Sequence, residues 1–266
     1  MTILRGIQPV VEGDPYERVH VEAINENIGL LIGDLSLSTF EDRLSDAWLK
    51  CLDKDPYAFK VTSVFNSIIA DAGEQWEADI VLVDIGPNLC AINRSVAISS
   101  TYLILPVASD LFSLQGIKNL GITLEKWREE WRRRENPRPT RILSPKGEMI
   151  PLGYIIMQYT AQSRRPVRAY KRWADRIPKV YQKYLATDTQ SPLPSLEADP
   201  ACLGLLKHYH SLAPMSMEAK KPIFLLKPAD GAIGAHMTAV NSSYADFERV
   251  TDRIQREMEA HAPTVE

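Results

Sequence analysis

Apolar residues occur along the chain in short runs, and stretches of helical periodicity separate most of these runs. Five runs predict buried strands, at residues 28–34, 79–86, 102–107, 149–157 and 222–228. Apolar residues three or four apart predict helices over residues 57–76, 111–131 and 240–258. The run at 79–86 is apolar on both faces, as a central parallel strand covered by helices must be. Strands that alternate with helices predict an α/β domain with a mostly parallel sheet.

Two local features refine this prediction. Ser38, followed three residues later by Glu41, has the spacing of a capping box at a helix start. Residues 160–220 interrupt the alternation with one basic helix and a stretch near 187–200 that is rich in Pro, Ser and Asp. We therefore expect a single α/β domain over residues 1–266, with a partly helical basic insertion at 160–220.

Composition narrows the class of protein. The 266 residues carry a formal net charge of −3, so any contact with nucleic acid must come from a local basic patch. Three widely separated cysteines predict neither a disulfide framework nor a metal site. The sequence contains no secretory signal and no apolar run long enough to span a membrane. We expect a soluble, cytoplasmic protein with no membrane partner.

Asp84 is the first residue with a chemical role to consider. It follows the apolar run at 79–86, and the carboxyl ends of strands are where open α/β sheets bind ligands. A carboxylate there can hold Mg²⁺ through water, Gly86 and Pro87 fix a tight turn, and the next helix can face an anion with its first N–H groups. The alternative is an aspartate that only caps that helix.

Residues 78–121 resemble the central segment of the ParA/MinD-type partition ATPases, the deviant Walker A group of P-loop proteins. The matching positions are Asp84, Pro87, Tyr102, Pro106 and Gly116, whereas Thr101 stands where the family usually has Asp. The similarity runs from about residue 28 to the C-terminus and is interrupted by residues 160–220. It implies a P-loop-NTPase-like, three-layer fold, and ATP and Mg²⁺ as cofactors of the complete family form.

The family's phosphate loop, Lys-Gly-Gly-x-x-Lys-Thr, has no counterpart in this sequence. We find no G-x-x-x-x-G-K-[ST] motif, so the chain is expected to lack the first strand–loop–helix unit. Each charge-assisted hydrogen bond is worth roughly 1.5–3 kcal/mol, and losing several would weaken nucleotide binding by orders of magnitude. We expect little or no ATP hydrolysis and no catalytic residue, with weakened cofactor binding or none.

The resemblance also indicates binding residues nearer the C-terminus. It places nucleotide-base contacts at Gln158, where a strand ends, and at Lys227, Pro228 and Asp230 in the loop after the last predicted strand. The alternative for both places is an ordinary loop.

The basic insertion suits non-specific DNA, which the resemblance also implies. Arg168, Arg172 and Arg176 recur at helical spacing and are predicted to share one face. The alternative is a solvated helix whose Trp173 packs on the body of the protein. The candidate DNA-binding residues are Arg164, Arg165, Arg168, Lys171, Arg172 and Arg176.

Three functions remain open at this point. The chain is a shortened form of a dimerising ATPase in DNA partition or positioning, or a non-catalytic module that binds DNA or a protein. In the third hypothesis it is a structural subunit that pairs through an open sheet edge, as a homodimer or with a partner protein.

Overall fold

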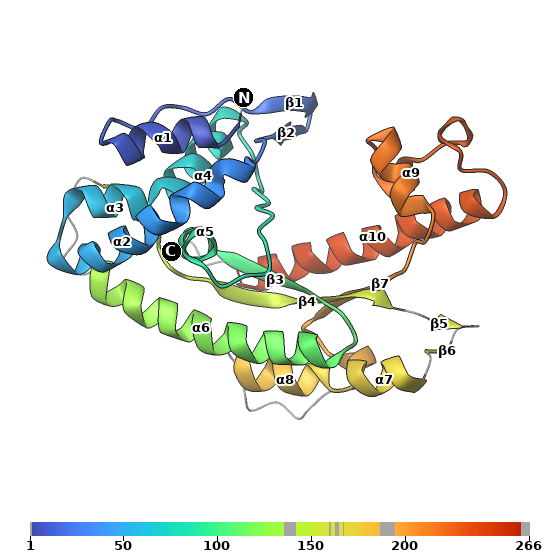
Figure 1. Cartoon of the computed structure of the whole chain (residues 1–266). Coiled ribbons are helices and arrows are strands. Elements are labelled where there is room, and N and C mark those ends of the chain that lie inside the picture. The colour runs from blue at the N-terminus through green and yellow to red at the C-terminus, as the bar shows by residue number, and fades with distance from the viewer. Residues whose placement is uncertain are drawn as a thin grey trace. The chain divides into compact units, whose positions relative to one another are not determined.

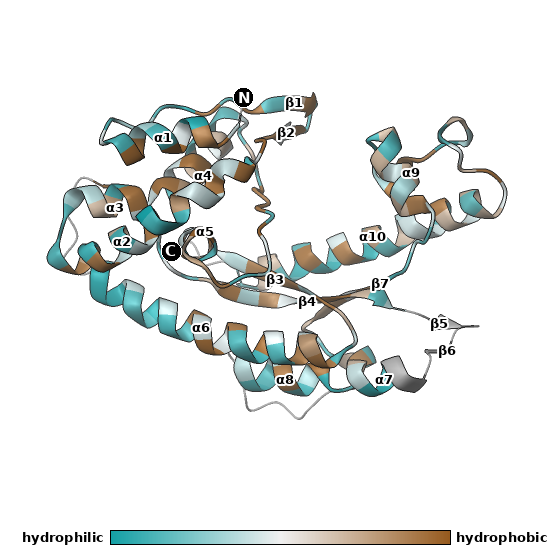
Figure 2. Ribbon diagram, in the orientation of Figure 1, coloured by the Kyte–Doolittle hydropathy of each residue, from teal (hydrophilic) through white to brown (hydrophobic). Residues whose placement is uncertain are grey.

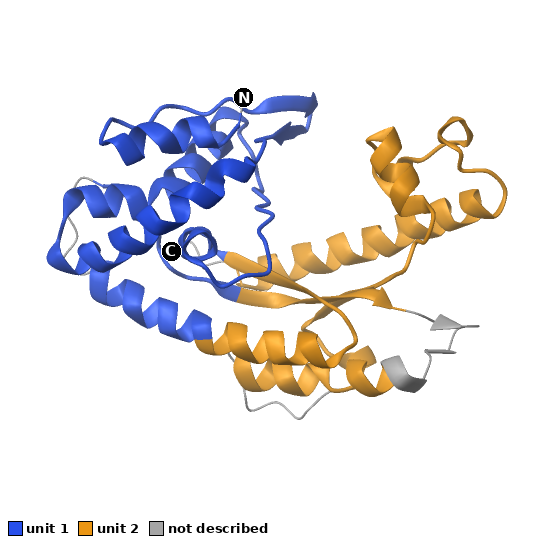
Figure 3. Ribbon diagram, in the orientation of Figure 1, with its two compact units in different colours: residues 1–101, 123–150 blue, residues 102–122, 151–266 orange. Residues whose placement is uncertain are grey.

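A computed structural model describes residues 2–135, 142–159, 161–162, 165–166, 168–186 and 195–261 (Figure 1). The described chain divides into two compact units (Figure 3). Unit 1 comprises residues 1–101 and 123–150, and unit 2 comprises residues 102–122 and 151–266. The long helix α6 (Leu111–Glu135) contributes to both units.

Unit 1 is mainly helical. Its elements are α1 (Leu4–Glu12), β1 (Glu22–Asn25), β2 (Ile28–Leu30), the 3₁₀ helices η1 (Leu35–Phe40) and η2 (Cys51–Asp53), α2 (Glu41–Lys50), α3 (Pro56–Thr62), α4 (Val64–Gln75), α5 (Ala91–Ser99) and the later part of α6. The core lies around the stacked rings of Trp48 and Trp131, with Phe59 inclined against Trp131. These three side chains are almost fully buried.

Unit 2 contains the parallel sheet. Its strands are β3 (Tyr102–Val107), β4 (Ile150–Tyr159) and β7 (Cys202–Lys207), in the order β3-β4-β7. The other elements are α7 (Arg168–Ala174), α8 (Ile177–Tyr184), α9 (Leu212–Ala219), α10 (Ala235–His261), the short strands β5 (Ala161–Gln162) and β6 (Arg165–Pro166), and the 3₁₀ helices η3 (Leu196–Ala198), η4 (Ile223–Leu225) and η5 (Pro228–Asp230). A parallel sheet flanked by helices confirms the predicted fold class.

Buried polar contacts fix the sheet of unit 2. The Tyr154 hydroxyl donates to a carboxylate oxygen of Asp199 over 2.6 Å, and burial raises the pKa of Tyr154 far above its ordinary value. The ring of Tyr181 packs against Tyr154, with 5.2 Å between ring centroids. Arg253 of α10 donates to the Pro200 carbonyl over 3.0 Å and so ties the last helix to the turn before β7.

The strand predicted at residues 222–228 is wrong. Residues Ile223–Leu225 form a 3₁₀ turn, and Leu226 is buried in a separate small cluster with Leu212, Ala232 and Val240. The strand beside β4 is instead β7, which lies within the stretch predicted to be an insertion. The sequence did not predict β7, because its central residue is Gly204 and glycine in a strand interior weakens the strand. A Cβ at Gly204 would come within 2.4 Å of Val250 Cγ2, so the glycine lets α10 approach the strand.

Two predicted helices are each divided in the structure. Residues 57–76 form α3 and α4, which are separated at Ser63. The basic helix of the insertion is likewise two helices, α7 and α8. Pro178 lies in the first turn of α8, and its ring would clash with the carbonyl of Ala174, where α7 ends.

The strand predicted at residues 79–86 is also wrong. The chain there belongs to no sheet and runs as an irregular coil between α4 and α5 (Figure 1). Figure 2 shows that this coil is strongly hydrophobic, and every residue from 77 to 89 is exposed. Residues 28–34, predicted as a buried strand, form only the short β2, which pairs with β1 and is exposed along its whole length. A strand needs a paired neighbour as well as apolar residues, and no strand of the described residues pairs with 79–86.

No helix in the described ranges is both long enough and apolar enough to cross a bilayer.

Candidate functional site

Asp84 lies in an exposed loop that leads into α5. Asn93 of α5 holds this loop, because its side-chain amide donates to the carbonyl oxygens of Gly86 and Asn88, each over 2.6 Å. No atom lies within 4 Å of the position that a Cβ on Gly86 would take, so the turn faces open space. The Asp84 carboxylate has no hydrogen bond or ion pair within the described part of the chain, which leaves it free to hold Mg²⁺ through water.

The N-terminus of α5 already holds an anion, the carboxylate of Glu41. One carboxylate oxygen accepts from the Ala91 N–H, and the other accepts from the Ile92 N–H over 3.1 Å. These are the N–H groups that we predicted could face an anion. A negative side chain at this position satisfies unpaired donors and the positive end of the helix dipole. A phosphate could bind here only by displacing Glu41.

The predicted capping box at Ser38 is therefore wrong. Ser38 donates to the Leu35 carbonyl inside η1, and Asp34 caps that turn by accepting from the Ser36 N–H over 2.9 Å. The hydroxyl of Thr2 also donates to Asp34, and this bond is the main cause of the lowered pKa of that carboxyl. The acid of the expected capping box, Glu41, caps a helix fifty residues away instead.

A pair of arginines beside the start of α5 was not predicted. The guanidinium groups of Arg94 and Arg134 each lie 4.3 Å from the centroid of a Trp48 ring. Burial lowers the pKa of Arg94, and the negative charges of Glu130 and Glu41 oppose that shift. Arg134 also donates to the carbonyl oxygens of Trp48 and Glu130, so it is part of the core. No local sequence pattern indicates this cluster, because its members come from α2, α5 and α6.

The residues predicted to contact a nucleotide base lie in unit 2. Gln158 is exposed near the end of β4 and has a left-handed backbone, with φ 55°. This conformation costs about 1–2 kcal/mol in a residue other than glycine, and such strain is common at functional sites. It coincides with an irregularity in the pairing of β4 and β7 between Ile156 and Tyr159. The backbone therefore departs from regular strand geometry at Gln158, near the carboxyl end of β4.

The second predicted base-contact loop is held by its own polar groups. Asp230 accepts from the Lys227 N–H over 2.9 Å and from the Lys221 ammonium over 2.8 and 2.9 Å. The bond from Lys221 is the main cause of the lowered pKa of Asp230. Pro228 begins η5, the turn that these bonds close. A role in base contact stays a prediction for all three loop residues and for Gln158.

Several lysine and arginine side chains of the basic insertion are exposed to solvent. The described and exposed ones are Lys171, Arg172, Arg176, Lys179 and Lys183. The guanidinium groups of Arg172 and Arg176 lie 5.9 and 4.8 Å from the ring centroid of Trp173, which holds them on one surface despite the break between α7 and α8. Arg164 lies outside the described residues, and the side chains of Arg165 and Arg168 are likewise not described.

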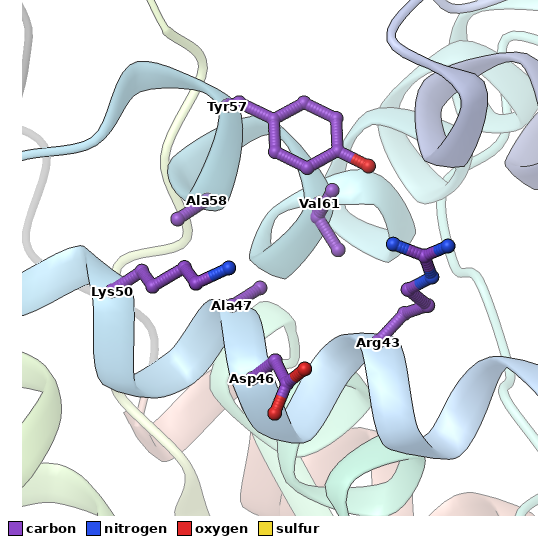
Figure 4. Close-up of a pocket in the computed structure, with 7 residues that line it drawn as sticks. All are labelled: Arg43, Asp46, Ala47, Lys50, Tyr57, Ala58 and Val61. Carbon is purple, nitrogen blue, oxygen red and sulfur yellow. The ribbon is translucent and has the colours of Figure 1, made fainter.

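A small cavity in unit 1 is lined by Arg43, Asp46, Ala47, Lys50, Tyr57, Ala58 and Val61 (Figure 4). Its volume is about 30 Å³, which is room for a water molecule, whereas ligand pockets usually measure about 300–1,000 Å³. The cavity is therefore no nucleotide site. Within the described ranges, no three His, Cys, Asp or Glu side chains group as a metal site either.

The three-stranded parallel sheet flanked by helices defines an α/β protein, consistent with a P-loop-NTPase-like fold. The AAA domain family matches residues 3–136, half of the chain, and the chain belongs to this family.

Known proteins similar to this chain include a curated relative and a solved structure. The uncharacterized protein MJECL24 of Methanocaldococcus jannaschii is 24% identical over 157 residues, which is 59% of this chain and 51% of that protein. The chain thus spans about half the length of this curated relative. The crystal structure of protein DIP2308 from Corynebacterium diphtheriae is similar over 79% of this chain and 70% of its own, with a TM-score of 0.59 and 21% identity. This likeness concerns the fold alone.

Proposed function

We propose that this chain is a ParA/MinD-like member of the P-loop ATPase class that acts in DNA partition or positioning. In its complete form it associates with ATP, Mg²⁺ and DNA, whereas these 266 residues hydrolyse little or no ATP. The observation that carries the proposal is the Asp84 loop. It presents a free carboxylate between an apolar segment and a helix start, as the family does, but the helix start is occupied by Glu41.

The described residues suit one part of a Mg²⁺–nucleotide complex and not the other. Asp84 can hold Mg²⁺ through water. A triphosphate, however, needs several converging N–H groups and positive side chains, and the sequence has no glycine-rich loop to provide them. The first N–H groups of α5 are already satisfied. This division supports a nucleotide-associated family role without efficient hydrolysis by this chain.

A calorimetric titration of the chain with ATP and Mg²⁺ tests the nucleotide part of the proposal. We expect a Kd weaker than about 100 µM and no hydrolysis above background, because the hydrogen bonds and charges of a phosphate loop are missing. Asp84→Ala is the matched variant, since its side chain makes no bond within the described residues. Micromolar binding that disappears in Asp84→Ala would mean that the site assembles without the loop, and the expected inactivity would be refuted.

DNA association rests on the exposed cations around Trp173. We expect the chain to bind a random duplex, with an affinity that falls about 40-fold between 50 and 200 mM salt if three cations contact phosphates. The double variant Arg172→Glu with Arg176→Glu should weaken binding and lower the salt slope by about two. Fluorescence anisotropy with a labelled duplex measures both quantities.

The matched control for the DNA experiment changes the same charge elsewhere. Arg132 and Arg133 are exposed on α6, where Arg133 is paired with Glu129. The double variant Arg132→Glu with Arg133→Glu should leave the salt slope unchanged. Equal losses of DNA affinity in both double variants would indicate an effect of net charge alone and would exclude a DNA surface on α7 and α8.

A further inference from the structure

The apolar segment Ile80–Ile85 is exposed to solvent although nearly all of its residues favour strands. Leu82 is 84% exposed, and the other four apolar residues, Ile80, Val81, Val83 and Ile85, are 39–51% exposed. Four of these residues are β-branched and therefore pack well in a sheet. An exposed apolar run of this length is uncommon on a monomeric protein and indicates a surface that another polypeptide covers.

The backbone of this segment is also free to pair. Ala78 donates to the Gly73 carbonyl at the end of α4 over 2.9 Å. Beyond it, residues 79–85 make no backbone hydrogen bond with any described residue. Val81 lies beside α4, because a Cβ on Gly73 would be 3.6 Å from Val81 Cγ2. The segment is thus attached at its start and presents unpaired N–H and C=O groups along its length, which is the template for strand addition.

The charges around the segment restrict the partner. Residues 77–93 contain Glu77, Asp79 and Asp84 and no lysine or arginine. Pairing with a second copy would bring two sets of these carboxylates together, and like charges in neighbouring strands are destabilising. The matching partner strand is apolar on both faces, because both faces of Ile80–Ile85 are apolar, and it carries basic residues at its ends.

We propose that Ile80–Ile85 is a docking segment that forms a β-strand when an apolar, basic-ended strand of another polypeptide pairs with it. The main-chain hydrogen bonds supply the pairing, alternate side chains supply the apolar contact, and Asp79 and Asp84 select the basic ends. This interaction requires neither nucleotide nor DNA, so its test is independent of the proposed ATPase-family role.

The experiment uses the full chain and a labelled peptide, Lys-Lys-Val-Ile-Val-Ile-Val-Lys-Lys, without nucleotide or DNA. Anisotropy measures binding, and hydrogen exchange measures the protection of the amides at 79–85. We expect saturable binding with protection of these amides. Peptides with Pro for the central Val, or with Glu for every Lys, should bind at least about tenfold more weakly, because the first cannot complete the pairing and the second repels the acidic segment.

Two chain variants complete the test. Leu82→Pro removes a donor from the docking segment and should weaken the lysine peptide about tenfold. Leu35→Pro is the matched control, because Leu35 is 98% exposed and begins a 3₁₀ helix, where proline is tolerated. The proposal is overturned by absent binding, by equal binding of the glutamate peptide, or by no effect of Leu82→Pro. Protection of 79–85 that rises with chain concentration alone would also overturn it, since the occupant would then be a second copy.

Discussion

Alanine in place of Trp131 should lower the free energy of unfolding of unit 1 by roughly 3–5 kcal/mol, the usual cost of removing a large buried ring. The side chain is 1% exposed. Its ring centroid lies 5.7 Å from that of Trp48 and 6.3 Å from that of Phe59. The indole N–H also donates to the Pro145 carbonyl over 2.9 Å, so the substitution removes both a packing centre and a buried hydrogen bond.

Urea unfolding followed by circular dichroism measures this effect. Because the chain has two compact units, two transitions are to be fitted if they separate. Trp131→Phe is the control: it keeps a ring but loses the donor to Pro145, and should cost about 1–2 kcal/mol. A loss below about 1 kcal/mol in Trp131→Ala would contradict the view that this ring organises the core of unit 1.

Gly121→Ala should destabilise unit 2 by about 1–3 kcal/mol. A Cβ at Gly121 would come within 2.3 Å of the carbonyl oxygen of Tyr184, the last residue of α8. The atom that the added Cβ would contact belongs to the backbone, so no side-chain rotation can relieve the clash. The helices α6 and α8 must therefore move apart. The measurement is the midpoint of thermal unfolding, supported by urea unfolding of the same variant.

Gly116→Ala is the matched substitution on the same helix. No atom lies within 4 Å of the added Cβ, so alanine should stabilise the helix by about 0.5–1 kcal/mol through its higher propensity. Opposite signs for the two variants are therefore expected. If both glycines behaved alike, the close approach of α6 and α8 at Gly121 would be refuted.

The longest patterned elements were predictable from the sequence. Helices α6 and α10 and strands β3 and β4 are present where periodicity or a continuous apolar run predicted them. The break before Pro178 was also available to sequence reasoning, since proline clashes with the carbonyl four residues earlier. The family resemblance, however, emphasised Gly116, whereas the glycine that allows close helix packing is Gly121.

The remaining errors have one physical cause. The structure of each segment depends on a contact with residues elsewhere in the chain or outside it, and local sequence does not show that contact. Residues 79–86 have the composition of a central strand but no strand beside them. Glu41 has the spacing of a local cap but bonds to α5. For the candidate site, sequence reasoning proposed Asp84, whose role stays a prediction, and missed Glu41 and Arg94, because their contacts join helices that are far apart in sequence.

The bond from Glu41 to the start of α5 also has a consequence for the order of folding during synthesis. Glu41 and Ala91 are fifty residues apart, an interval that a ribosome covers in roughly 3–10 seconds. Helix–coil relaxation takes about a microsecond, so the ten residues of α2 can form and lose their helix many times before the first turn of α5 is made. The Glu41 carboxylate is therefore available when α5 emerges, and it can accept from the first N–H groups of α5 as soon as they are made.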